Sequence, residues 1–182
     1  GLNKLFFDIE QPLCVVLRNI EERGVRVSTD VLKALEKKYG EIIEGLTKEI
    51  YSLAGETFNI ASPKQLGDIL FDKLGLPHGK KTKTGYSVSE DVLSNLAPKH
   101  PIVNAVLEYR HYAKLQSTYV MGLQPLVNRG RIHTEFNQCI TQTGRLSSTN
   151  PNLQNIPARS DEAKDIKSAF IPGENCVLVS AD

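Results

Sequence analysis

Residues 28–53, STDVLKALEKKYGEIIEGLTKEIYSL, carry the longest helical pattern in the chain. Their apolar side chains recur every three or four positions, which places them on one face of a helix. Ser28 stands just before the pattern and is a favoured N-cap, because its hydroxyl can accept a backbone N–H of the first turn. The apolar positions are Leu32, Leu35, Tyr39, Ile42, Leu46, Ile50 and Leu53. We predict a long amphipathic helix with a narrow apolar seam.

Further helices are expected on both sides of this segment. Upstream, a helical pattern should end at Gly24. Downstream, SPKQ at 62–65 has the form of a capping box with proline in the first turn, and a short helix should begin near Ser89. Pro101 should open a second long helix that runs to about Gln124. Two long helices joined by short ones predict an antiparallel pair with a small helical tip.

The pattern changes after residue 125. Residues 131–141 alternate between apolar and polar and predict a half-buried strand. The stretch to 157 is rich in Ser, Asn, Pro and Gln and is expected to be an ordered loop. A short helix should lie near 162–169, and CVLVSA at 176–181 predicts a buried strand. The expected fold class is therefore α+β, mainly helical first and then with the first strands of an antiparallel sheet.

Bulk composition sets few limits on function. The 182 residues carry a net charge of +1, so any basic surface must come from local placement of Lys and Arg. The three cysteines fit neither a zinc site nor a disulfide framework, which favours a reducing, cytoplasmic setting. No segment reaches the roughly 20 apolar residues that span a bilayer. The chain lacks a starting Met and ends inside an expected strand, so we expect a fragment of a longer protein.

Several residues could carry chemistry, each with a plain structural alternative. Asp182 follows an apolar strand, where it could hold a metal ion or simply begin a turn. The lysines at 80–83 could clamp phosphates or form a solvated tip. Arg110, Lys114 and Ser117 would share a helix face that could follow a duplex backbone or simply be solvated.

The loop after residue 141 has the same two interpretations. Gly144 before Arg145 would permit close approach to a ligand, and arginine can donate to base edges in a groove. The amides of Asn152, Gln154 and Asn155 can donate or accept. Alternatively, this loop satisfies its own backbone.

One alternative can be set aside. Asp8 and Glu10 have the spacing of a nuclease carboxylate pair. They stand at the start of a helix, where acidic residues favour the helix dipole, and no partner strand follows. We therefore do not expect an exonuclease site there.

A resemblance then covers the whole chain in order. TQTGRLSS at 141–148 with PNLQNIP at 151–157 resembles the signature upstream of motif A in A-family DNA polymerases of the bacterial DNA polymerase I type. VLVSAD at 177–182 is similar to the start of motif A. The segments at 58–66, 80–87 and 109–119 resemble the thumb, and EQPL at 10–13 resembles the entry to the polymerase domain.

This resemblance implies a division into a junction at 1–27, a thumb at 28–125 and the first part of the palm at 126–182. Asp182 would bind the two catalytic Mg²⁺ ions, and Arg145 would contact the minor groove at the primer terminus. The implied DNA-binding residues are Lys81, Lys83, Thr84, Ser87, Arg110, Lys114, Ser117, Thr118, Thr143, Arg145, Asn152, Gln154, Asn155 and Arg159.

The resemblance also implies what these residues lack. The family's second catalytic Asp and the fingers that bind the incoming dNTP are not among them. We expect part of a monomeric, template-directed DNA polymerase that grips primer–template duplex, has no membrane contact and is inactive as an isolated fragment. The alternative is a non-catalytic helical DNA-binding or clamp module that reuses the thumb.

Overall fold

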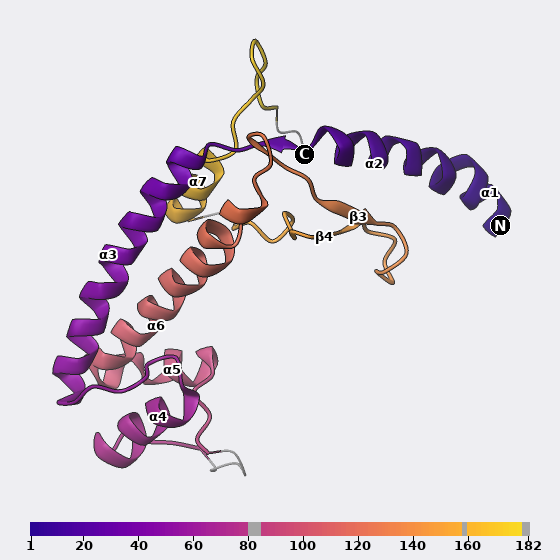
Figure 1. Cartoon of the computed structure of the whole chain (residues 1–182). Coiled ribbons are helices and arrows are strands. Elements are labelled where there is room, and N and C mark those ends of the chain that lie inside the picture. Colours follow the sequence, from indigo (N-terminus) through magenta and orange to yellow (C-terminus); the bar gives the residue numbers. More distant parts are fainter. Residues whose placement is uncertain (80–84, 158–159, 180–182) are drawn as a thin grey trace. The chain divides into compact units, whose positions relative to one another are not determined.

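The computed structural model describes residues 1–79, 85–157 and 160–179 (Figure 1). They fall into two compact units, one formed by 1–36 with 118–182 and the other by 37–117. The boundary lies within two helices, α3 (Thr29–Ala54) and η4 (Leu115–Met121). No helix in the described ranges is long and apolar enough to cross a membrane. The division into junction, thumb and palm stays a prediction.

The unit formed by 37–117 contains the expected antiparallel helix pair, the second helix being α6 (Pro101–Lys114). Near one end, the Tyr39 and Tyr112 rings lie 5.6 Å apart. Towards the other end, Ile50 shares a buried cluster with Ile102. The short elements of the tip complete this cluster with Leu66, Leu70 and Leu93. They are α4 (Pro63–Gly67), η2 (Asp68–Lys73), α5 (Glu90–Leu96) and η3 (Ala97–Lys99).

Local signals placed most helix ends correctly. The Ser28 hydroxyl accepts a hydrogen bond from the Val31 N–H at 3.3 Å, as expected of an N-cap. Gly24 follows α2 (Gln11–Arg23) with a φ of 61°, a conformation that glycine adopts without strain. The capping box predicted at 62–65 is confirmed for Ser62 but wrong for Gln65. Ser62 accepts from the Gln65 N–H, but the Gln65 amide oxygen accepts from the Asn59 N–H at 2.7 Å, so it secures the preceding turn.

The second long helix changes character along its length. It begins at Pro101 as predicted, but the regular α-helix ends at Lys114. It continues as the π-helical segment η4 and then as a 3₁₀ turn, η5 (Gln124–Leu126). Predicting one uniform helix to Gln124 was therefore only partly right.

The other unit begins with one long helical run, α1 (Leu2–Leu5), the π-helical η1 (Phe6–Glu10) and α2. Two small antiparallel sheets follow. β1 (Val25–Arg26) pairs with β2 (Arg131–Ile132), and β3 (Glu135–Asn137) pairs with β4 (Ser147–Thr149). α7 (Asp161–Ser168) lies in the expected place. A small core of Val27, Leu32, Leu123, Ile132 and Ala169 holds this unit together.

Two strand predictions need correction. The single strand expected over 131–141 is two short strands, because its halves pair with different partners and Thr134 turns its hydroxyl inward between them. The strand expected over 176–181 is absent from its described part, 176–179, where Val177 is 80% and Val179 83% exposed. No strand of the described chain pairs with this segment, and an unpaired strand leaves its backbone groups unsatisfied.

Candidate nucleic-acid interface

Arg110, Lys114 and Ser117 follow one another on consecutive turns at the end of α6 and the start of η4. The side chains of Lys114 and Ser117 are exposed, and the Ser117 hydroxyl donates to the Lys114 carbonyl at 3.4 Å. A groove of about 540 Å³ lies beside them. It is lined by Glu90, Ser94, Leu107, Arg110, His111 and Lys114. Three of these six side chains are basic and one is acidic, so the groove suits an anionic ligand.

Arg110 also has a structural role. Its Nη1 donates to the Val88 carbonyl at 2.5 Å, which ties α6 to the segment that precedes α5. Burial lowers the pKa of this half-buried guanidinium, and the nearby Glu90 carboxylate partly offsets that effect. Ser87 is exposed one residue before Val88, so the backbone at Ser87 is fixed through Arg110. A guanidinium has five N–H donors, and the bond to Val88 leaves others for a ligand.

The loop at 141–146 is shaped by its own backbone. Gly144 has a φ of 74°, and no heavy atom lies within 4 Å of the position a Cβ would take. Glycine is therefore required here for its conformation, not for a close approach within the chain. The Thr141 hydroxyl donates to the Arg145 carbonyl at 2.5 Å. This leaves the side chains of Thr143 and Arg145 exposed on a defined turn.

The amide-rich segment that follows is similarly anchored through its backbone. The Asn152 carboxamide oxygen accepts from the Gln154 N–H at 3.0 Å. The Asn155 carbonyl accepts from the Tyr119 hydroxyl at 2.5 Å, which links the segment to η4. The side chains of all three amide residues are exposed. The loop can therefore satisfy its own backbone and still present these side chains to a ligand.

Two buried hydroxyls support this segment, and no clear signal in the sequence pointed to them. The Thr134 and Ser148 side chains are 6% and 1% exposed, and their oxygens lie 2.6 Å apart. Ser148 also accepts from the Leu153 N–H at 3.1 Å, and Pro151, after a cis peptide bond, offers its carbonyl to both hydroxyls. The only hint was the place of Thr134 in the alternating stretch.

Other expected site residues lie outside the described ranges. They are Lys81, Lys83, Thr84, Arg159 and Asp182. Among the described residues, no group of three or more His, Cys, Asp or Glu side chains could hold a metal ion. The expectation of Mg²⁺ therefore rests on Asp182 alone. Asp8 and Glu10 lie within η1, and the Glu10 carboxylate accepts from the Gln138 amide at 2.7 Å.

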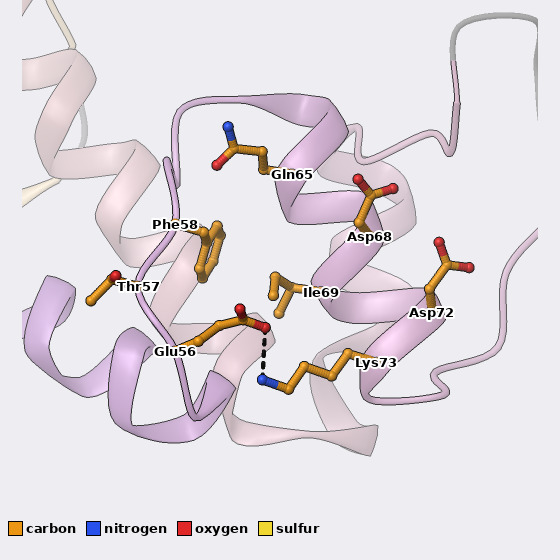
Figure 2. Close-up of a pocket in the computed structure, with 8 residues that line it drawn as sticks. All are labelled: Glu56, Thr57, Phe58, Gln65, Asp68, Ile69, Asp72 and Lys73. Carbon is orange, nitrogen blue, oxygen red and sulfur yellow. Dashed lines mark hydrogen bonds and ion pairs between the residues drawn. The ribbon is translucent and has the colours of Figure 1, made fainter.

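The tip of the 37–117 unit carries a pocket of the opposite charge (Figure 2). Its volume is about 500 Å³, and its carboxylates come from Glu56, Asp68 and Asp72. Only Lys73 contributes a positive charge, and its Nζ lies 2.7 Å from the Glu56 carboxylate. Such a surface repels phosphates, so within this unit the α6 groove is the better candidate for a DNA backbone.

The described site residues thus form two groups. Ser87, Arg110, Lys114 and Ser117 belong to the 37–117 unit, and Thr118 with the loop residues belongs to the other. Apart from the half-buried Arg110, the residues of both groups are exposed, and they bear cationic, hydroxyl or amide side chains, which suits contacts with phosphates and base edges.

Comparisons with known proteins agree on one family. DNA polymerase family A matches residues 29–182. The chain is 54% identical to the DNA polymerase I of Streptococcus pneumoniae serotype 4 over all of its length and 21% of that protein. It is 52% identical to the DNA polymerase I of Geobacillus stearothermophilus over 98% of its length. The chain thus spans about a fifth of the length of these relatives.

A solved structure shares the fold. It is the POL domain of Pol1 from M. smegmatis in complex with DNA primer-template and dNTP. The TM-score is 0.87 at 42% sequence identity, over 94% of this chain and 30% of the other.

Proposed function

The chain belongs to DNA polymerase family A, and we propose on that premise that it grips primer–template duplex for a template-directed DNA polymerase. The observation that carries the proposal is the likeness, over nearly all of this chain, to a polymerase domain in complex with DNA primer-template and dNTP. The proposed product of the longer enzyme is DNA extended by nucleotidyl transfer.

The contacts with DNA are proposed to come from both groups of exposed residues. Lys114, with Arg110, Ser87, Ser117 and Thr118, would hold backbone phosphates, which carry no sequence information. The cations and hydroxyls of Lys81, Lys83, Thr84 and Arg159 are proposed to extend this grip.

The loop at 143–155 is proposed to lie against the minor groove near the primer terminus. Arg145 would donate there to purine N3 or pyrimidine O2, acceptors that are alike in all correct pairs, so the contact would test pair geometry. Its exposed side chain, on a turn fixed by Gly144 and Thr141, supports this role. Thr143, Asn152, Gln154 and Asn155 are proposed as its neighbours on the DNA.

The catalytic role is proposed for Asp182 as a ligand of a divalent cation. Mg²⁺ is the proposed ion, because carboxylate oxygens are the ligands it prefers. The second carboxylate and the dNTP site would come from the rest of the polymerase, so the 182 residues alone are proposed to be inactive.

The test compares Asp182→Ala with wild type in the full-length polymerase that carries these residues. We expect loss of primer extension with duplex affinity retained. Asp161→Ala, which removes an exposed carboxylate on α7, is the matched control and should extend normally. Normal extension by Asp182→Ala would disprove the catalytic role. A full-length protein that binds duplex but never extends it would favour the clamp alternative.

A further inference from the structure

A second basic cavity lies in the unit formed by 1–36 and 118–182, where α2 meets the turn before β2. Its volume is about 620 Å³. Three arginines and a histidine line it, together with one acid. The lining residues are Glu22, Arg23, Asn128, Arg129, Arg131 and His133. The acid, Glu22, is already paired with Arg18 at 2.7 Å, so the positive charge of the cavity is not neutralised from within.

Two of the basic side chains form a wall that hydrogen bonds hold against the end of α2. The Arg131 guanidinium donates to the carbonyls of Arg23 and Gly24 at 3.2 Å each, where a cation also complements the dipole of α2. The His133 Nδ1 donates to the Glu21 carbonyl at 2.8 Å, because a carbonyl can only accept. The His133 ring is also packed so closely that a Cβ on Gly24 would meet it at 2.8 Å. This wall is therefore in place before any ligand arrives.

The other two basic side chains, Arg23 and Arg129, are exposed, and neither guanidinium forms a hydrogen bond or ion pair within the described chain. Both guanidiniums remain able to take a two-pronged grip on an anion.

The backbone of Arg129 gives an independent sign that its side chain matters. Asn128 and Arg131 exchange backbone hydrogen bonds of 2.8 and 2.9 Å around a two-residue turn. The central residues have φ values of 50° for Arg129 and 75° for Gly130. Such a turn favours Asn-Gly, and a long side chain at its first central position strains the backbone. A strained residue on a cavity wall is a common mark of a functional position.

We propose that this basic cavity binds a phosphate group, held by Arg23 and Arg129 against the wall of Arg131 and His133. Guanidinium groups match the geometry of phosphate oxygens, and three of them line this one cavity together with a histidine. The phosphate could belong to a nucleic-acid backbone or to a free anion such as pyrophosphate, since the recognition chemistry is the same. This site shares no residue with the duplex grip proposed above.

The test uses hydrogen–deuterium exchange in the full-length polymerase, followed in peptides that cover 18–26 and 125–134. Pyrophosphate and a single-stranded oligonucleotide are added separately at constant ionic strength. Protection by either probe supports the proposal. Protection by only one of them identifies the source of the phosphate. Absence of protection by either probe overturns it. The readout is local, so it does not depend on whether the protein extends primers.

Variants make the test specific. Arg129→Asn installs the residue that the turn favours, and Arg23→Gln is tolerated at the end of a helix, so the double variant should fold. We expect it to bind the protecting probe roughly tenfold more weakly, because two charge-assisted contacts are lost. Lys33→Gln removes one exposed charge elsewhere on the same unit and should bind as wild type. If Lys33→Gln weakened binding of the probe equally, the effect would come from general electrostatic attraction, and the proposal would be overturned.

Discussion

The hydroxyl oxygen of Thr134 lies 2.6 Å from that of Ser148, and both side chains are buried. Thr134 precedes β3 and Ser148 lies in the middle of β4, so the pair ties the residue before one strand to the facing strand. Ser148 also accepts the Leu153 N–H, which ties the hairpin to the amide-rich segment. The placement of Asn152, Gln154 and Asn155 therefore depends on two hydroxyls that touch no DNA in the proposed function.

Ser148→Ala should destabilise the chain by about 1–3 kcal/mol, because it leaves buried polar partners unsatisfied. Ser147→Ala is the matched control. The Ser147 hydroxyl is buried without a hydrogen-bond partner among the described residues, so its removal should cost about 0.5 kcal/mol or less. Urea unfolding would measure both changes. Equal costs for the two serines would contradict the role given to the Thr134–Ser148 pair.

Gly144→Ala should destabilise by about 1 kcal/mol, because the φ of 74° disfavours any residue with a Cβ. The Cβ itself would meet no atom, so the cost comes from the backbone alone. Gly45→Ala, in the interior of α3 and also with free space, should instead stabilise by about 0.5–1 kcal/mol. Thermal unfolding would reveal these opposite signs. Two shifts of the same sign would refute the conformational argument.

Arg110→Ala should destabilise by about 1.5–3 kcal/mol, since it removes a charge-assisted hydrogen bond to a buried residue. Arg110→Lys should recover only part of this, because an ammonium cannot reproduce the planar fork. Exchange of the amides at 87–89 would report the loosened segment. The control is Arg18→Ala, which removes an exposed ion pair with Glu22 and should change stability little. Unchanged exchange at 87–89 in Arg110→Ala would show that the bond to Val88 has no positioning effect.

Lys114→Ala should weaken duplex binding by the same factor for all sequences and lower the slope of log K against log salt by about 1. The reason is that a phosphate contact releases about one counterion when it forms. Lys48→Ala, which removes an exposed lysine of α3 paired with Glu44, should leave the slope unchanged. Fluorescence anisotropy with labelled duplex at several salt concentrations would measure both. A slope unaffected in Lys114→Ala would remove that residue from the proposed grip.

The helices were predictable because their signals are local. Ser28, Gly24 and Pro101 each act within one turn of the residue that they begin or end, and the structure confirms all three. The strands were not, because a strand needs a partner that is distant in the sequence. β1 finds its partner more than 100 residues later, and nothing around Val25 indicated that pairing.

The candidate site, too, could be predicted only in part from the sequence. The shared helix face of Arg110, Lys114 and Ser117 followed from helical spacing. The bond from Arg110 to Val88 did not, since it depends on how α5 packs against α6. The basic cavity at Arg23 and Arg129 was missed as well, because its residues come from two segments that meet only in the folded chain. An Arg-Gly pair in a tight turn before a strand was the one available signal.

The π-helical segment η4 lets its helix hold one residue more than a regular α-helix would. A π-helical turn can be regarded as an α-helix with one residue inserted. In a regular α-helix an inserted residue would rotate every later side chain by about 100° around the axis, whereas the wider π-helical turn absorbs the extra residue. Tyr119 therefore keeps the orientation in which its hydroxyl reaches the Asn155 carbonyl, and the amide-rich segment stays tied to the helix. Substitutions at the exposed positions Ser117 and Thr118 should leave this tie in place.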